Sequence, residues 1–189
     1  MPSTSMTGNR VSPLSAASLA AHSSFFLAFS VLLPSLFHWT GVPGPMFLPM
    51  HIPVLLCGLL LGPKPGGMVG LAAPLASAFL TGMPPLAPLP VAQMMAFELC
   101  AYGSVAGLMR FSLKRGPLLC LITAMMCGRI VLGLCAMCAL YLFGVRFSPV
   151  AYVSGAVLTG LPGMFLQILL LPVLGRLLGK MGVRGNVEC

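Results

Sequence analysis

Long apolar runs alternate with short segments rich in proline and glycine along most of the chain. The first run extends from about Pro13 to Phe37. At about 1.5 Å of rise per residue, a helix of that length crosses a hydrocarbon core of about 30 Å. We predict a membrane helix that begins at Ser12-Pro13, with serine as N-cap and proline in the first turn. A cleaved signal peptide is the alternative, but the run is too long and no A-x-A cleavage site follows it.

Two shorter apolar segments follow, from about His51 to Leu61 and from about Gly66 to Leu80, joined by Gly62-Pro-Lys-Pro-Gly66. The first is short for a full membrane crossing. The pair therefore forms either two short or tilted helices or a re-entrant hairpin. Both alternatives return the chain to the same side of the membrane, so the downstream topology is unaffected.

Three further apolar segments complete a predicted bundle of six helices, at about Val91 to Met109, Pro117 to Phe143 and Val150 to Leu178. Gly160-Leu-Pro-Gly163 predicts an interruption of the last one, tolerated only where neighbouring protein or a wet cavity satisfies the freed backbone groups. We predict an all-α membrane protein with six transmembrane helices over residues 13–180. Residues 1–12 are expected to be a disordered cytoplasmic N-terminus, and residues 181–189 a cytoplasmic tail.

The distribution of charge supports this topology. Only 6% of the residues are charged and 58% are hydrophobic, whereas soluble domains carry about 25% charged residues. With a cytoplasmic N-terminus, Arg146 is the one basic residue in an outer loop, and eight lie inside: Arg10, Lys64, Arg110, Lys114, Arg115, Arg176, Lys180 and Arg184. This asymmetry predicts that both termini are cytoplasmic and both proline-rich loops face outward. The basic residues form no aromatic-interleaved patch, so we expect no nucleic-acid partner despite the net charge of +8.

Few residues offer catalytic or metal chemistry. Six of the seven cysteines lie in apolar segments, and Cys135-Ala-Met-Cys138 lacks the βαβ context of a redox motif. The three histidines are scattered. Walker, G-x-S-x-G and H-E-x-x-H motifs are absent from the sequence. We therefore expect no enzyme, no bound metal and no cofactor.

Two ionisable residues, Glu98 and Arg129, lie within apolar segments. Exposing either to lipid costs roughly 2.5–3.5 kcal/mol, so both should face the bundle interior. Their estimated depths differ by roughly 9 Å, which two long side chains can bridge. The pair is either a structural ion pair or the wall of a cavity that holds a polar ligand, and the sequence leaves both alternatives open.

A ligand pocket is predicted in the outer half of the bundle, below the loops at residues 41–50 and 81–90. Tyr102 lies one helical turn after Glu98, and Gln93 lies closer to the mouth. His51 could contact a ligand or simply face the membrane interface, since a lone histidine has no visible partner. The predicted substrate-binding residues are Met46, Met50, His51, Gln93, Glu98, Tyr102 and Arg129.

Small residues recur at the four-residue spacing that allows close helix approach. Gly66/Gly70, Gly103/Gly107 and Gly175/Gly179 form GxxxG pairs, for which packing within the chain is the simplest explanation. The first helix carries four alanines near its cytoplasmic end, where docking of another membrane subunit is the alternative. The predicted docking residues are Ala16, Ala17, Ala20 and Ala21.

Several of these motifs together resemble the substrate-binding (S) components of energy-coupling factor (ECF) transporters. The similar segments are Pro45 to Lys64, Thr81-Gly-Met-Pro-Pro85, Phe97 to Gly103 and Gly160 to Gly163, and the likeness extends over about residues 13–180. The small-residue motif on the first helix, which in this family docks the coupling subunit, matches Ala16 to Ala21.

The resemblance implies a high-affinity binder of a vitamin or related micronutrient in a bacterial cell membrane. Its partners would be a transmembrane coupling protein and two ATPase subunits encoded elsewhere. Which vitamin is bound does not follow, because S components share a fold while their pockets diverge. A solitary transporter or channel and a non-transporting assembly factor are the alternatives.

Overall fold

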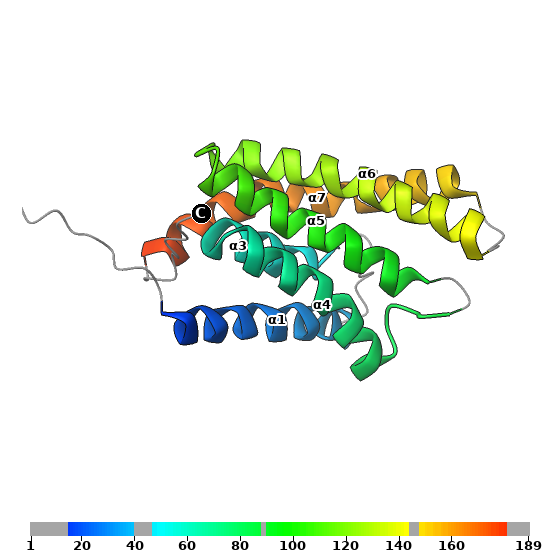
Figure 1. The fold of residues 1–189 in the computed structure, drawn as a ribbon, viewed down its shortest axis with the longest axis horizontal. Helices are drawn as coiled ribbons and strands as arrows, with labels where there is room; N and C mark the ends of the chain where they lie inside the picture. The colour runs from blue at the N-terminus through cyan, green and yellow to red at the C-terminus, as the bar shows by residue number, and fades with distance from the viewer. Residues whose placement is uncertain (1–14, 40–46, 88–89, 144–147, 181–189) are drawn as a thin grey trace, which may run out of the picture.

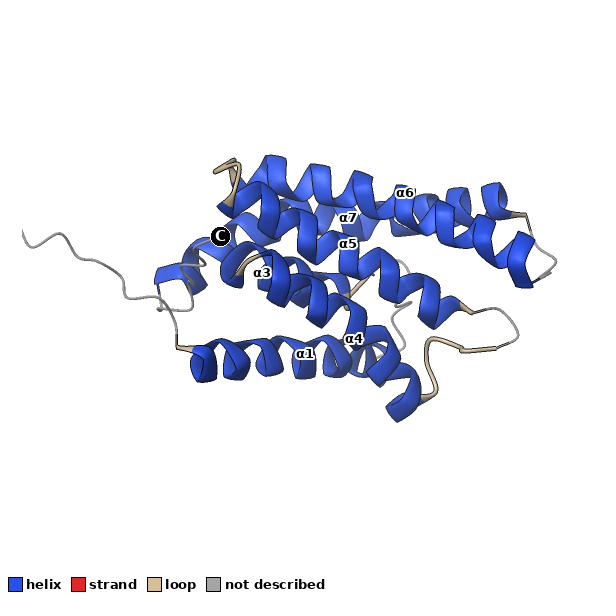
Figure 2. Ribbon diagram, in the orientation of Figure 1, coloured by secondary structure: helices blue, strands red, loops and turns tan. Residues whose placement is uncertain are grey.

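The computed structural model describes residues 15–39, 47–87, 90–143 and 148–180. Over these ranges the chain is helical and has no strand (Figures 1 and 2). The helices are α1 (Ala16–Trp39), α3 (His51–Leu61), α4 (Pro63–Thr81), α5 (Val91–Phe111), α6 (Pro117–Phe143) and α7 (Pro149–Lys180). The prediction of an all-α chain is confirmed.

Four of the helices, α1, α5, α6 and α7, contain stretches long and apolar enough to cross a membrane. Together they make the chain a multi-pass membrane protein. The prediction of six crossings is matched only in part, because α3 has 11 residues and α4 is not among the long apolar spans. The cytoplasmic placement of both termini remains a prediction.

The short helix α3 forms the centre of the bundle. All of its residues from His51 to Leu61 are buried, and it packs against α1, α4, α5 and α7. A helix that is apolar on every side is stable only when it is surrounded. Gly62 alone joins α3 to α4, with φ 110°, a conformation that favours glycine. Its N–H donates a hydrogen bond to the carbonyl of Gly58 at 3.1 Å, so the chain turns back sharply.

Glycines bring α4 and α5 into backbone contact. A Cβ added at Gly70 would collide with the Leu99 carbonyl and would lie 2.8 Å from the Cys100 nitrogen. One added at Gly103 would collide with the backbone of Gly66. Both glycine pairs on these helices therefore serve internal packing. Gly175 differs, because an added Cβ there meets nothing within 4 Å.

The predicted interruption at Gly160 to Gly163 is wrong, because α7 continues through it with Pro162 inside the helix. Proline removes one backbone hydrogen bond and crowds the preceding turn. Membrane helices absorb this change through neighbouring helices and small local adjustments. Gly160 and Gly163 are both buried, so this part of α7 faces the protein.

The described part of α1 begins at a serine cap. The N–H of Ser18 donates to Ser15 Oγ at 3.2 Å, which satisfies one free donor of the first turn. The predicted cap at Ser12-Pro13 lies outside the described residues, as do residues 1–12 and 181–189. Four alanines of the first two turns are exposed on the helix surface: Ala16, Ala17, Ala20 and Ala21.

Candidate functional site

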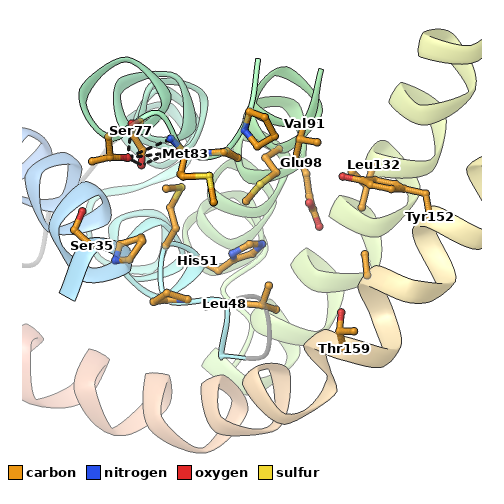
Figure 3. Close-up of a pocket in the computed structure, with 18 of the residues that line it drawn as sticks. Ser35, Leu48, His51, Ser77, Met83, Val91, Glu98, Leu132, Tyr152 and Thr159 are labelled. Carbon is orange, nitrogen blue, oxygen red and sulfur yellow. Dashed lines mark hydrogen bonds between the residues drawn. The ribbon is translucent and has the colours of Figure 1, made fainter. Parts of the chain in front are cut away.

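A cavity of about 350 Å³ opens near one end of the bundle, where α1, α4, α5, α6 and α7 surround the start of α3 (Figure 3). It is lined by Pro34, Ser35, Leu48, Pro49, Met50, His51, Ser77, Thr81, Met83, Pro84, Pro85, Val91, Met95, Glu98, Arg129, Leu132, Tyr152, Ala156 and Thr159. Most of these side chains are apolar, and a few polar groups converge on the same space. Small-molecule sites in proteins have this character.

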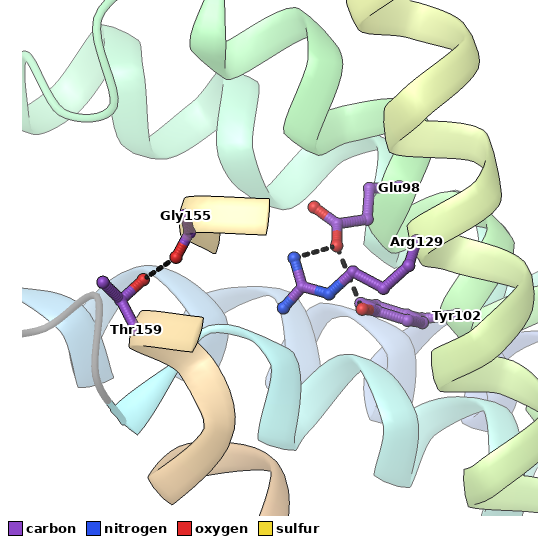
Figure 4. Close-up of polar contacts among 5 residues, drawn as sticks. All are labelled: Glu98, Tyr102, Arg129, Gly155 and Thr159. Carbon is purple, nitrogen blue, oxygen red and sulfur yellow. Dashed lines mark hydrogen bonds and ion pairs between the residues drawn. The ribbon is translucent and has the colours of Figure 1, made fainter. Parts of the chain in front are cut away.

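The charged part of the wall is an ion pair between α5 and α6. Arg129 Nη1 lies 2.9 Å from Glu98 Oε1, and the two side chains are 12% and 3% exposed. The Tyr102 hydroxyl, one turn along α5, donates to the same Glu98 oxygen at 3.0 Å (Figure 4). The Tyr102 ring lies directly against α6, where a Cβ at Gly128 would overlap it. Glycine at this position therefore lets the tyrosine reach the carboxylate.

Several buried polar atoms at and beside this ion pair have no hydrogen-bond partner. Within the described ranges, Arg129 Nε and Nη2 and both ring nitrogens of His51 are buried and unpaired. His51 is only 2% exposed, and its ring lies against that of Tyr102 with centroids 5.1 Å apart. Most buried polar groups in proteins are hydrogen-bonded, so each exception needs an explanation. Unpaired polar groups on residues that line a cavity suit a ligand that carries hydrogen-bonding groups of its own.

The segment that enters α3 is held against α7. Gln167, 1% exposed, donates from Nε2 to the Leu48 carbonyl at 3.3 Å. Leu48 has φ 48°, a left-handed conformation that is uncommon for a residue other than glycine. Leu48 lines the cavity, and a Cβ added at Gly160 on α7 would lie 3.0 Å from its Cδ1. This hydrogen bond connects the cavity wall to the middle of α7.

The predicted site residues are placed as follows. Met50, His51, Glu98 and Arg129 line the cavity. Tyr102 lies behind Glu98 and holds it in place. Gln93 is not among the lining residues, and its Nε2 donates to the Leu86 carbonyl at 3.5 Å. Met46 lies outside the described residues.

Sequence reasoning missed the contributions of α1 and α7 to the cavity. Tyr152, Ala156 and Thr159 are spaced to share one face of α7, but this spacing does not show whether the face contacts lipid or lines a site. The contribution of Met95 could have been predicted, because it lies three residues before Glu98 on the same helical face. No sequence pattern around Pro34 and Ser35 on α1 indicates that they line the cavity.

A family model described as "ECF transporter, substrate-specific component" matches residues 21–175, which is most of the chain. No curated protein and no solved structure matches. The matched segment includes the ion pair, the buried helix α3 and every residue that lines the cavity. Members of this family are transport proteins that work with an ECF module. The chain therefore belongs to the family of substrate-specific components of ECF transporters.

Proposed function

We propose that the chain captures a vitamin or related micronutrient at the outer face of a bacterial cell membrane. A transmembrane coupling protein and two ATPase subunits would then drive its uptake. One observation carries the proposal: a cavity inside the helix bundle is lined by His51 and Arg129, and both residues have buried, unpaired polar atoms. Because an unpaired buried donor costs about 1–3 kcal/mol or more, these groups are better explained by ligand binding than by packing.

The size of the cavity favours a small ligand. Its volume of about 350 Å³ lies at the lower end of the range of about 300–1,000 Å³ for small-molecule sites. A single vitamin-sized molecule fits this description better than a macrocycle. The wall of prolines and methionines supplies apolar contact, and the groups around Glu98 would set orientation and specificity.

The position of the cavity supports access from outside. It lies at the C-terminal end of α4 and the N-terminal end of α5, beside residues 81–85. Lys64, Arg110 and Arg176 lie at the opposite helix ends. Because basic residues concentrate on the cytoplasmic side, this arrangement supports a cavity in the outer half of the bundle.

The exposed alanines of α1 are proposed to dock the coupling protein, since small side chains allow close backbone approach. The test is uptake in proteoliposomes that contain this chain, the coupling protein and both ATPases from the same cell. Replacing Ala17 and Ala21 by tryptophan should abolish uptake while the purified chain still binds ligand. Ala28→Trp is the matched control, because Ala28 is also exposed on α1 but lies outside the small-residue motif.

The outcomes separate the alternatives. Uptake by vesicles that lack the ATPases would show a solitary transporter and contradict the proposal. Loss of both binding and uptake in the alanine variant would mean that these residues pack internally. If Ala28→Trp reduces uptake equally, the alanine motif has no specific role in docking the coupling protein.

A further inference from the structure

Of the three guanidinium nitrogens of Arg129, only Nη1 has a partner among the described residues. Its Nη1 pairs with Glu98 Oε1 at 2.9 Å. Its Nε and Nη2 are buried and have no hydrogen-bond partner in the described part of the chain. These two nitrogens belong to the same edge of the planar guanidinium, so their N–H groups form a fork. Such a fork matches the two oxygens of a carboxylate.

The Nη2 end of this fork lies against α7. Figure 4 shows the guanidinium extending from α6 towards the α7 segment that carries Thr159. A Cβ added at Gly160 would lie 3.3 Å from Arg129 Nη2 and 3.0 Å from Leu48 Cδ1. Gly160 therefore packs close to Nη2, where even a methyl group would be crowded, and the neighbouring Leu48 side chain is apolar. Among the described residues no acceptor fills this position.

His51 supplies a second unpaired polar group on the same cavity wall. It is 2% exposed, and neither ring nitrogen is hydrogen-bonded within the described ranges. A neutral imidazole offers one donor and one acceptor. A ligand that satisfied both His51 and Arg129 would therefore present at least two separate polar groups.

The charge balance limits what the fork can hold. Arg129 and Glu98 together are neutral, so a bound dianion would leave two negative charges without a balancing cation, whereas a carboxylate would leave one. A cationic group at the fork would face unpaired donors and be repelled by the guanidinium. One negative charge spread over two coplanar oxygens fits the geometry, since it completes the hydrogen bonds of the fork without displacing Glu98.

We infer that the ligand is a small organic acid whose carboxylate accepts both hydrogen bonds from the Nε–Nη2 edge of Arg129. A second polar group of the ligand pairs with His51, and its apolar body lies against Pro34, Met50 and Met95. This inference rests on the proposed function, because it names the chemical class that the same cavity takes.

The test begins with the wild-type chain purified in mild detergent. Small molecules that it retains are released, methyl-esterified and weighed by mass spectrometry, so that each carboxyl group is identified by one added methyl group. In parallel, binding is measured for acids and their uncharged analogues: biotin and biotinamide, nicotinate and nicotinamide, pantothenate and panthenol, lipoate and lipoamide. We expect a retained carboxylic acid, and for any acid that binds, an uncharged analogue that binds roughly 100-fold more weakly.

Variants of Arg129 test whether its guanidinium binds the carboxylate of the ligand. Arg129→Lys keeps the positive charge beside Glu98 but loses the fork, so it should weaken binding of the acid by roughly 10- to 100-fold and leave binding of the uncharged analogue unchanged. If Arg129→Lys does not insert into the membrane, the double variant Glu98→Gln/Arg129→Gln, which is also neutral overall, is used in its place. It too should bind the acid more weakly and the uncharged analogue as the wild type does. Phe165→Leu, at an exposed position on α7, is the control and should bind as the wild type does.

Three results would overturn the inference. A retained molecule that is neutral, or that carries a phosphate in place of a carboxylate, would contradict it while leaving substrate capture intact. An uncharged analogue that binds as tightly as its acid, or an Arg129→Lys variant with unchanged affinity, would do the same. If no molecule is retained and neither member of any pair binds, the proposed function fails together with the inference.

Discussion

Replacing Gly70 by alanine should destabilise the bundle more than its single added methyl group suggests. The new Cβ would overlap the Leu99 carbonyl oxygen and lie 2.5 Å from its carbon and 2.8 Å from the Cys100 nitrogen. These are backbone atoms of α5, so no side-chain rotation can relieve the collision. The two helices would have to separate along their shared seam.

The expected loss of stability is the difference between two opposing contributions to the free energy of unfolding. Overpacking of a tight interface costs about 1–3 kcal/mol, and alanine in place of glycine recovers up to about 1 kcal/mol of helix propensity. Because the colliding atoms are backbone, the cost lies in the upper part of that range, about 2–3 kcal/mol, and we expect a net loss of about 1–2 kcal/mol in the free energy of unfolding. The assay is an SDS titration of the purified protein, with helix content followed by far-UV circular dichroism.

Gly175→Ala is the matched control. It makes the same substitution inside a helix, but an added Cβ there meets nothing within 4 Å. It should leave stability unchanged or raise it slightly. A Gly70→Ala protein as stable as the wild type, or a control that is destabilised equally, would refute the packing explanation of the α4–α5 glycines.

Three further outcomes are expected. Tyr102→Phe removes a hydrogen bond to the Glu98 carboxylate and should cost about 1.5–3 kcal/mol of stability in the same titration; no change would mean that the bond contributes nothing. Gln167→Leu leaves the Leu48 carbonyl without its donor and should cost about 1–3 kcal/mol, whereas a stability equal to that of wild type would show that α7 does not hold this segment. A variant whose one cysteine is Cys189 should react with a membrane-impermeant maleimide in inside-out vesicles and not in intact cells; labelling of intact cells would contradict the predicted orientation.

The helix boundaries were predictable where proline and glycine separate the apolar segments. The predicted segments from His51 to Leu61 and from Pro117 to Phe143 agree with α3 and α6 at both ends. In each case a proline or a polar loop prevents extension of the helix on one side. The sequence could not show that α3 is buried on every side, because an apolar segment looks the same whether lipid or protein surrounds it.

The error at Gly160 has a physical cause. Proline and glycine interrupt helices in water, where the freed carbonyl is solvated and the chain can turn away. In a bundle, leaving the helix exposes several backbone groups to an apolar medium, so continuing it with one missing hydrogen bond is less costly. The composition of the segment was informative about something else: Gly160 allows Leu48 and Arg129 to approach α7.

The polar part of the site was more predictable than its apolar part. A chain with two intramembrane charges has few ways to satisfy them, and the structure has Glu98 and Arg129 in contact. The contributions from α1 and α7 depend on how the helices are arranged around α3. No local pattern at Pro34 or Ala156 distinguishes a cavity wall from a lipid-facing surface.

The most direct test of the central claim is native mass spectrometry of the protein released from lipid nanodiscs. Wild-type protein should carry one small-molecule adduct per chain. Ala156→Trp, which places a large ring in the cavity, should lose the adduct, while Ala151→Trp, at an exposed position on the same helix, should keep it. A wild-type protein that never carries an adduct, or an Ala156→Trp protein that carries it as the wild type does, would contradict the assignment of this cavity as the substrate site.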